Sequence, residues 1–357
     1  MTQPKIIDAH LDLSMNAIEW NRDLRMTTSQ IRTMEAGMTD KPDRGNSTVS
    51  FQELKDGNIW LCVATMIARY VKPGHPLPGW NSPSQAWAQT RAQLSWYQEM
   101  SRLGHMKPIT DLTELNNHLN DWDNLDSKMP LGYILSLEGA DSVVTLDHLY
   151  IMHSEGLRAI GPAHYGPGTY AYGTDSDGSI GAKGRELIHK ISELSLIMDV
   201  THLSDTSFWE VLDCHQGPLW ASHSNCRSLV NHNRQFTDEQ ILTIIERGGV
   251  IGIPLDAWMM IPNWKRQVST PESTGVSLSH MIDHMDHICQ LTGSCDHIMI
   301  GTDLDGGFGT EQCPKDLDTI ADLQKLPALL INRGYSSNDI KGILSGNFLR
   351  FIRRAWA

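Results

Sequence analysis

The chain has 357 residues, of which 40% are hydrophobic and 20% are charged, and its formal net charge is −13. A chain of this length and composition can bury a large core, and it is long for an ordinary domain but normal for an α/β barrel. The negative charge and the lack of a Lys/Arg stripe argue against nucleic acid as a partner.

The amino terminus, MTQPKIIDAH, has no basic region followed by an apolar stretch, and no run reaches the ~18 apolar residues that a membrane-spanning helix needs. We therefore expect a soluble, cytoplasmic protein with no membrane partner. The six cysteines show no C-x-x-C pair and no even ladder of spacings, which argues against a zinc ribbon or a disulfide framework. Reduced thiols with packing roles are the expectation.

Short apolar runs rich in β-branched residues alternate with longer amphipathic stretches. The runs predict eight strands, at residues 5–10, 58–69, 130–138, 157–164, 196–202, 218–223, 249–255 and 297–303. Helical patterns lie between them, at 84–103, 111–120, 145–155, 181–195, 204–213, 237–247 and 277–292. The clearest helix is TDEQILTIIERGG, where Thr237 and Gln240 form a capping box and Gly248 can end the helix. The tail predicts a further amphipathic helix that starts near Ser336.

Strands that alternate with helices imply parallel pairing, and eight such units close into a (β/α)8 barrel. An open, doubly wound sheet is the competing architecture. It would carry a glycine-rich phosphate turn after the first strand, and DAHLDLSMNA has none. We therefore predict an α/β fold, a TIM barrel with C-terminal helices, in which residues 1–357 form a single domain.

Polar residues follow the predicted strands at their carboxyl ends, which in an α/β barrel all face the rim where active sites form. They are His10 and Asp12 after the first strand, Glu138 after the third, His164 after the fourth, His202 after the fifth, His223 after the sixth and Asp303 after the eighth. Each residue alone has an ordinary structural explanation, such as a turn or a solvated loop. Together they predict one site.

Imidazole nitrogens and carboxylate oxygens without a nearby cysteine suit zinc, or another borderline first-row ion, rather than magnesium or calcium. The number of ligands suggests two ions with one bridging carboxylate, and two ions ~4 Å apart can share a hydroxide nucleophile at neutral pH. Hydrolysis of a polarised carbonyl would follow. No G-x-S-x-G serine elbow is present, which disfavours covalent catalysis.

Six segments of the chain resemble the membrane (renal) dipeptidase family of the amidohydrolase superfamily, in the same order and over nearly the whole length. They are IIDAHLDLS, LSLEGAD, VTHLSD, ASHSN with Arg234 downstream, IMIGTDLDGG and ILSGNFLR. The resemblance implies a binuclear zinc hydrolase on a (β/α)8 barrel. It implies that His10 and Asp12 bind one zinc, that His202 and His223 bind the other, and that Glu138 bridges them.

The resemblance also implies roles for three residues outside the ligand set. Asp303 would handle the proton of the attacking water and of the leaving amine, and His164 would steady the oxyanion of the tetrahedral intermediate. Arg234 would meet the substrate carboxylate. These roles suit the chemistry of a carboxylate, an imidazole and a guanidinium.

The main hypothesis is a zinc dipeptidase that cleaves L-Xaa-L-Xaa or L-Xaa-D-Xaa dipeptides and binds no partner other than a small peptide, with a homodimer as an open option. The chain departs from the family after the seventh strand, where it reads IPLDAW, so the contacts of Asp256 and Trp258 with a substrate are open. Two alternatives therefore remain: hydrolysis of another amide, lactam or lactone, and a barrel that keeps metals only for stability. The segment HYGPGTYAYGTDSDG predicts either a lid or a long surface turn.

Overall fold

Eight parallel strands form the centre of the molecule in a computed structural model that describes residues 3–72, 74–124 and 129–357. They are β1 (Ile6–Leu11), β2 (Ile59–Ile67), β4 (Leu131–Glu138), β5 (Leu157–Ile160), β6 (Ile197–Asp199), β7 (Leu219–Trp220), β8 (Ile251–Ile253) and β9 (Ile298–Ile300). Their order is β7-β6-β5-β4-β2-β1-β9-β8. A parallel bridge between Ala221 and Ile251 joins the two ends of this path, which curls the sheet into the predicted barrel.

The predicted strands are all present, but the sequence overestimated the length of the later ones. The run 297–303 ends as a strand at Ile300, and the run 196–202 ends at Asp199. His202 and Asp303 instead adopt left-handed backbone conformations, with φ of 69° and 59°, which a strand cannot contain. A short extra strand, β3 (Met106–Pro108), was not predicted and pairs with β4 outside the barrel path.

The seven helices predicted between the strands are present, with ends that differ by at most four residues. They are α4 (Pro83–Arg102), α5 (Leu112–Asn124), α6 (Leu146–Ser154), α7 (Gly181–Glu193), α8 (Asp205–Cys214), α9 (Asp238–Glu246) and α12 (Leu278–Thr292). The capping box of Thr237 and Gln240 begins α9 as predicted, and Gly248 follows its last turn with φ of 73°.

Shorter helices fill the connections and were not predicted. They are α1 (Leu13–Ile18), α2 (Thr28–Met34), α3 (Phe51–Asp56), α10 (Ala257–Met260), α11 (Pro271–Thr274), η1 (Thr310–Gln312), η2 (Ile320–Lys325) and α13 (Leu326–Arg333). The predicted C-terminal helix is divided into α14 (Ser337–Lys341), a π-helical turn η3 (Gly342–Gly346) and α15 (Asn347–Ala355). Ser336 and Asp339 form the capping box at its start.

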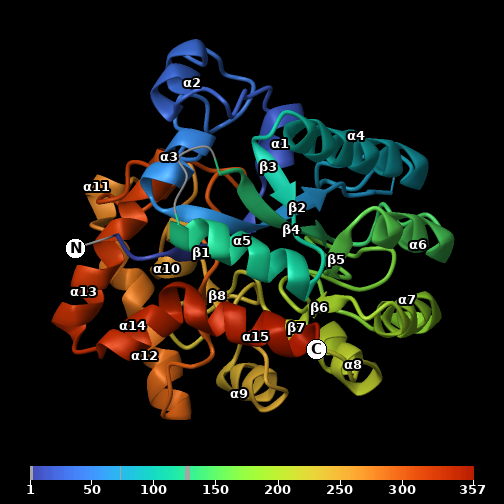
Figure 1. The fold of residues 1–357 in the computed structure, drawn as a ribbon. Helices are drawn as coiled ribbons and strands as arrows, with labels where there is room; N and C mark the ends of the chain where they lie inside the picture. The colour runs from blue at the N-terminus through green and yellow to red at the C-terminus, as the bar shows by residue number, and fades with distance from the viewer. Residues whose placement is uncertain (1–2, 73, 125–128) are drawn as a thin grey trace.

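Helices α5 and α15 lie across one end of the barrel (Figure 1). Their apolar side chains, including Trp122 and Phe351, belong to one buried cluster with interior strand residues such as Ile7 and Leu61. A second and larger cluster fills the layer between the strands and the surrounding helices. Helices α5 and α15 thus cover the amino-terminal end of the barrel and leave the carboxyl ends of the strands for a site.

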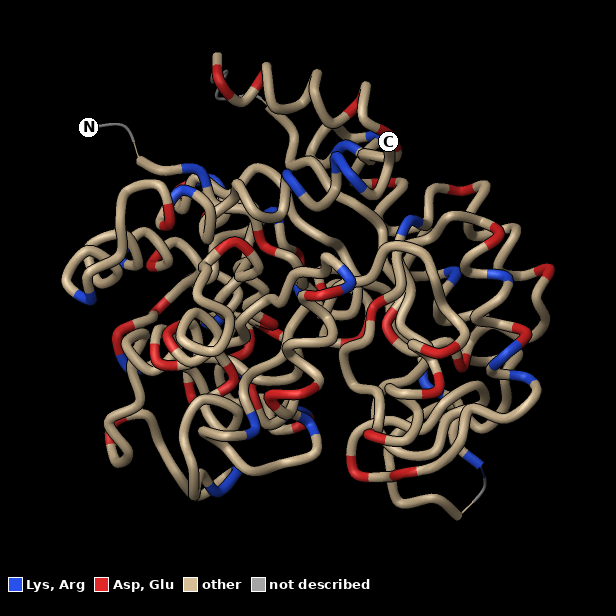
Figure 2. Tube along the Cα trace, turned by 90° about the horizontal axis from the view of Figure 1, so that it is seen from below, with Lys and Arg blue, Asp and Glu red and all other residues tan. Residues whose placement is uncertain are grey.

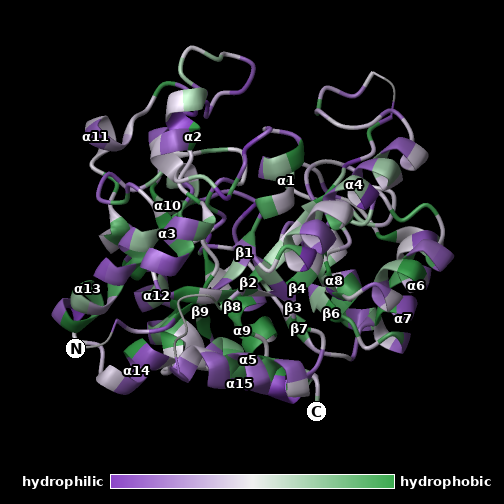
Figure 3. Cartoon of the chain, turned by 45° about the horizontal axis from the view of Figure 1, so that its top comes forward, coloured by the Kyte–Doolittle hydropathy of each residue, from purple (hydrophilic) through white to green (hydrophobic). Residues whose placement is uncertain are grey.

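The opposite end of the barrel is covered by loops and by α1, α2, α10 and α11, on the far side from α15 and both chain termini (Figure 3). Acidic and basic residues are interleaved along the trace (Figure 2). No helix in the described parts of the chain is both long enough and apolar enough to span a bilayer.

Candidate metal centre and active site

A cavity of about 980 Å³ opens at the carboxyl ends of the strands. Seven of the eight residues singled out in the sequence line it: Asp12, Glu138, His164, His202, His223, Arg234 and Asp303. The eighth, His10, is buried beneath its floor and contacts three of the lining carboxylates. The barrel therefore brings together residues that lie almost 300 positions apart in the chain, as parallel strand ends require.

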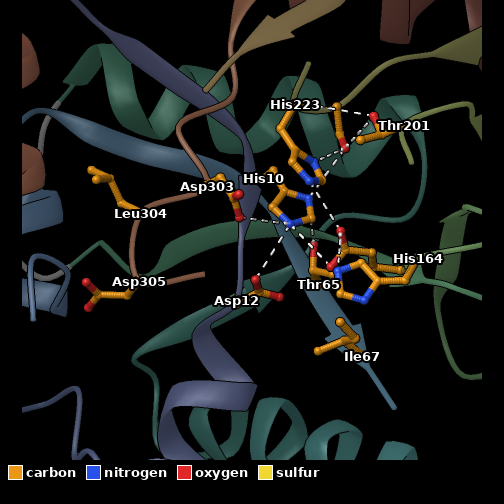
Figure 4. A network of polar contacts seen from close by, with 12 residues as sticks. His10, Asp12, Thr65, Ile67, His164, Thr201, His223, Asp303, Leu304 and Asp305 are labelled. Carbon is orange, nitrogen blue, oxygen red and sulfur yellow. Dashed lines mark hydrogen bonds and ion pairs between the residues drawn. The ribbon is translucent and has the colours of Figure 1, made fainter. Parts of the chain in front are cut away.

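One group of ligand atoms surrounds His10 (Figure 4). Its Nε2 atom lies 3.7 Å from Asp12 Oδ2, 3.7 Å from Glu138 Oε2 and 3.7 Å from Asp303 Oδ1. None of these distances is a hydrogen bond. His10 Nε2 and Asp12 Oδ1 are both buried, and neither has a hydrogen-bond partner among the described residues. Buried polar atoms of this kind are costly unless a missing group satisfies them.

A second group of ligand atoms surrounds the other oxygen of Glu138. Glu138 Oε1 lies 3.0 Å from His202 Nε2 and 3.2 Å from His223 Nε2, and the two Nε2 atoms are 3.2 Å apart. The Nδ1 atom of each ring faces a hydroxyl: Thr174 Oγ1 is 2.9 Å from that of His202, and Ser222 Oγ is 2.8 Å from that of His223. If Nδ1 donates to the hydroxyl, Nε2 keeps a lone pair for an ion.

Two buried aspartates hold the strand ends in position. Asp8 accepts hydrogen bonds from the backbone N–H of His10 and from Thr302, at 3.1 Å and 2.6–3.0 Å. Asp199 accepts from the backbone N–H groups of Thr201 and Ser222, at 3.0 and 3.1 Å. Each aspartate thus ties two neighbouring strand ends together. His10 lies within β1, whereas His202 and His223 follow the ends of β6 and β7, where the bonds of Asp199 hold the backbone beyond the sheet.

His202 and Asp303 have positive φ angles, which cost a residue with a Cβ about 1–3 kcal/mol each. The turned backbone directs both side chains into the cavity instead of along the sheet surface. Strain of this kind is typical of residues held in place for function.

The cluster of His10, Glu138 and Asp303 carries more negative than positive charge, and the shifted pKa values of its members reflect this. Burial alone would lower the pKa of His10, but Glu138, Asp12 and Asp303 outweigh it and raise the pKa to about 10. Burial raises the pKa of Glu138 to about 7 and holds that of Asp303 well above its usual range. Burial, helped by Arg234, holds the pKa of His202 well below its usual range. The carboxylates favour the protonated form of His10, whereas His202 stays neutral. The cluster therefore has room for additional positive charge.

The residues fit a metal centre. Three sets of His and carboxylate groups can each place their ligand atoms within 4.8 Å of one another: His10 with Glu138 and His223, Glu138 with His164 and His202, and His10 with Asp12 and Asp303. Glu138 belongs to two of the three sets. The donor set of imidazoles and carboxylates, together with the unpartnered His10 Nε2, matches a borderline divalent ion.

Arg234 lies in the wall of the cavity but is firmly held by the protein. It is 3% exposed and donates to Ser224 Oγ at 3.0 Å and to the carbonyl oxygen of His223 at 2.9 Å. Arg234 therefore also supports the backbone of a predicted metal ligand. This second contact is not evident from the sequence.

The cavity contains residues that the sequence analysis did not select. Among them are Glu19, Lys41, Arg69, Tyr165, Arg266 and Glu311. Arg69 ends the predicted run 58–69, so collecting the polar residue at the end of every strand would have found it. Arg266 and Glu311 lie in connections without a repeating pattern, and the sequence carries no signal for them.

Asp256 and Trp258, whose contacts with a substrate the sequence left open, also line the cavity. Asp256 accepts from Trp258 Nε1 at 2.6 Å and from Gln312 Nε2 at 2.9 Å, and Arg266 stacks on the Trp258 ring at 4.5 Å. The segment after His164 folds back on itself through a bridge between Tyr165 and Thr174. It is thus a wall of the site that also positions His202 through Thr174.

A parallel barrel with histidines and carboxylates at the carboxyl ends of its strands is the architecture of a metallohydrolase. A family model described as "Membrane dipeptidase (Peptidase family M19)" matches residues 1–356. The chain belongs to this family, and it is a hydrolase of the metallo-dipeptidase type.

Relatives share only part of the sequence. The chain is 28% identical over 216 residues to an uncharacterized protein of Klebsiella pneumoniae, which covers 58% of this chain and 76% of the relative. It is 25% identical over 233 residues to dipeptidase tcpJ of Claviceps purpurea, covering 62% of this chain and 51% of the relative. It is 28% identical over 171 residues to human dipeptidase 3, covering 48% of this chain and 32% of the relative.

Solved structures share the whole fold. A metallopeptidase described as dipeptidase AC superposes with a TM-score of 0.80 at 21% identity and covers 99% of each chain. A metallopeptidase from Rhodobacter sphaeroides, liganded with a phosphinate mimic of the dipeptide L-Ala-D-Ala, superposes with a TM-score of 0.79 at 20% identity, covering 99% of this chain and 100% of the other. At this identity the likeness supports the barrel fold.

Proposed function

We propose that this protein is a binuclear zinc dipeptidase that hydrolyses L-Xaa-L-Xaa and L-Xaa-D-Xaa dipeptides. The observation that carries the proposal is the position of Glu138, whose Oε2 faces His10 and whose Oε1 faces His202 and His223. One carboxylate between two groups of ligand atoms is the arrangement that a pair of ions requires. Residues 1–357 would act as one catalytic domain, since strands from both ends of the chain build the barrel.

The proposed ligands divide into two pairs. His10 and Asp12 would hold one zinc, His202 and His223 the other, and Glu138 both. Bound zinc would supply a water of lowered pKa and a polarised peptide carbonyl. The bound L-Ala-D-Ala mimic of the Rhodobacter sphaeroides metallopeptidase supports a dipeptide as the substrate class for this chain.

Three other side chains would carry the protons and the charges of the reaction. Asp303 would accept a proton from the attacking water and deliver it to the nitrogen of the leaving amine. Burial raises the pKa of Asp303, which makes it a stronger proton acceptor than an ordinary carboxylate. His164 would donate from Nε2 to the developing oxyanion, and Arg234 would bind the free carboxylate of the substrate.

The proposal is tested by measuring the release of free amino acids from a panel of L,L and L,D dipeptides. Zinc-loaded protein should cleave members of the panel, and protein stripped with a chelator should not until zinc is restored. Metal analysis of the active protein should give two zinc ions per chain. Full activity in metal-free protein would contradict the proposal.

Arg234 is tested with paired substrates, a dipeptide and its C-terminal amide. Arg234→Ala should raise KM for the dipeptide and leave KM for the amide nearly unchanged, because only the dipeptide carries the carboxylate. Since Arg234 also holds the carbonyl of His223, Arg234→Lys provides a second variant with the charge retained. An equal change for both substrates would assign Arg234 to support of the backbone.

A second candidate, the hydrolysis of a larger amide, lactam or lactone, is favoured by the volume of the cavity. At about 980 Å³ it is at the upper end of the range for small-molecule sites, and Asp256 and Trp258 form part of its wall. Adding N-acyl amino acids and lactones to the panel separates the two candidates. Turnover of any of them that Asp303→Ala abolishes, with zinc content unchanged, would exclude a purely structural role for the metals.

A further inference from the structure

Arg69 is a cation in the wall of the cavity. It follows β2 by two residues, and only part of its side chain reaches solvent. None of the described carboxylates forms a salt bridge with it, and its buried Nε atom has no hydrogen-bond partner among the described residues. A guanidinium stays charged in a protein, and burying it without a carboxylate is costly. The buried position of Arg69 is therefore not explained by a contribution to stability.

The remaining nitrogens of Arg69 are held on both sides. Nη1 donates to the carbonyl oxygen of Pro78 at 2.8 Å, and the backbone oxygen of Arg69 accepts from the N–H of Trp80 at 2.8 Å. Nη2 contacts Nδ1 of His164, and the guanidinium lies 5.8 Å from the centre of the Tyr165 ring. The contacts with Pro78 and Trp80 thus hold the guanidinium against one edge of His164.

This contact determines which nitrogen of His164 carries the proton. A guanidinium has five N–H donors and no acceptor, so the Nδ1 atom that it contacts must be the acceptor. A neutral imidazole with an unprotonated Nδ1 has its hydrogen on Nε2. In His164 that nitrogen lies inside the cavity, 3.8 Å from Glu138 Oε1, on the opposite side of His10 from Asp303 (Figure 4).

The same contact decides between two roles for His164. By distance alone, His164 could join Glu138 and His202 around an ion. A metal ligand needs a lone pair on Nε2, which would place the hydrogen on Nδ1, facing the donors of Arg69. That arrangement sets two donors against each other. The geometry is compatible only with His164 as a hydrogen-bond donor.

We infer that Arg69 is a positioning residue that holds His164 in its Nε2–H tautomer, which excludes His164 from the metal ligands and aims its N–H at the reacting carbonyl oxygen. The statement that the N–H points at the reacting carbonyl oxygen rests on the proposed dipeptidase function. The tautomer and the exclusion from the ligand set rest only on the contacts of Arg69.

The tautomer can be read by NMR on zinc-loaded protein with ¹⁵N-labelled histidine, with the signals of residue 164 assigned by their loss in His164→Gln. In the wild type, Nε2 of His164 should carry the hydrogen and Nδ1 should not. In Arg69→Met, which removes the donors while keeping an unbranched apolar side chain, the preference should be lost. A protonated Nδ1 in the wild type would overturn the inference. This measurement needs no turnover, so it decides the matter even if no dipeptide is cleaved.

The kinetic test is a double-mutant cycle. Arg69→Met should lower kcat by ~10²-fold, about the effect of losing one oxyanion donor, with little change in KM. In a His164→Ala background the same substitution should change kcat by less than about threefold, because the residue through which it acts is gone. Arg69→Lys, which can still donate to Nδ1, should recover part of the rate. An equal loss in both backgrounds would show that Arg69 acts independently of His164.

Arg266 offers the matched control, because it is another arginine of the cavity wall that contacts Tyr165. Arg266→Met should change kcat/KM by the same factor in the wild type and in the His164→Ala background. Coupling of Arg266 to His164 as strong as that of Arg69 would mean that the cycle reports general damage to the cavity, and the inference would fail.

Discussion

The molecule contains two clusters of buried charged residues, one around Arg22 and one at the metal centre, which meet in the chain at Asp305 and Asp303. They differ in whether the protein itself supplies cations to balance the buried carboxylates. In the first, Arg22 is fully buried and donates to Glu35 at 2.8 Å, with Asp43 at 3.0 Å and Asp305 at 3.8 Å. Arg44 adds a second guanidinium at Glu35. Each carboxylate of this Arg22 cluster has a cation supplied by the protein.

The metal centre has the opposite balance. Asp12, Glu138 and Asp303 converge with His10, and no Lys or Arg of the described chain forms a salt bridge with any of these three carboxylates. Asp303 and Asp305 are two residues apart, both have positive φ, and their side chains point to different clusters. The turn directs the side chain of Asp305 toward the Arg22 cluster and that of Asp303 toward the metal centre. Two nearby acids can therefore have different roles, one in stability and one in chemistry.

The largest effect should follow from removing a proposed metal ligand. His202→Ala should lower the zinc content toward one ion per chain and reduce kcat by ~10³-fold or more, because several kcal/mol of charge stabilisation are lost. Metal analysis and steady-state kinetics measure both quantities.

The control is His284→Ala, which removes another buried histidine. His284 is bonded to Cys226 N and Met260 O, away from the cavity, so this variant should lose stability and keep two zinc ions. Two zinc ions retained in His202→Ala would contradict the ligand assignment.

The next effect separates Asp303 from Asp305. Asp303→Asn should bind two zinc ions and lose ~10²-fold in kcat with little change in KM, since the shape of the side chain stays and the proton acceptor goes. Asp305→Asn, the matched change two residues further on, should keep kcat within a few-fold and lower stability instead. Loss of zinc in Asp303→Asn would show that Asp303 is a ligand rather than the proton carrier.

Disrupting the Arg22 cluster should lower the free energy of unfolding. Arg22→Met leaves Glu35, Asp43 and Asp305 without their shared cation, and removing one partner of a buried ion pair typically costs about 3–5 kcal/mol. Urea unfolding of the zinc-loaded protein measures the loss.

Arg25 provides the comparison, because its side chain is 48% exposed and pairs with Asp23 at the surface. Arg25→Met should change the free energy of unfolding by less than about 0.5 kcal/mol. Similar values for both variants would mean that the buried pairs contribute no more than exposed ones.

The smallest effect concerns Glu311, a half-buried carboxylate near Asp43 and Asp305 that forms no salt bridge with a described Lys or Arg. Burial raises its pKa to about 7, and its Oε2 atom has no hydrogen-bond partner within the described residues. The folded state therefore holds the proton more tightly than the unfolded state. The stability that this group contributes is fully present below about pH 4.5 and is lost as the pH rises through about 7.

In Glu311→Gln this pH-dependent part should disappear. The fall in unfolding free energy between pH 5 and pH 8 should then be smaller than in the wild type by on the order of 1–2 kcal/mol. Because the other titrating groups are the same in both proteins, their contributions to the pH dependence cancel in this comparison. Equal pH dependence would show that Glu311 is solvated in the folded protein.

The sequence was sufficient for the barrel and for most of the polar residues at its strand ends, although Arg69 was not selected. Periodicity marks the barrel strands and the longer helices locally, and in a parallel barrel all carboxyl ends of the strands share one rim. His10, Glu138 and His223 could be placed at one rim for this reason. The short helices α1, α2 and α3 were missed because they span less than two full turns each and leave no clear 3.6-residue period.

Only the tertiary structure decided how these residues divide their tasks. The sequence shows Asp303 and Asp305 as two equivalent acids in one turn, while the fold pairs one with Arg22 and leaves the other beside His10. It shows Arg69 only as the last residue of an apolar run, while the fold places its guanidinium against His164. Contacts between side chains depend on where loops bring distant residues together, and no local pattern records that distance.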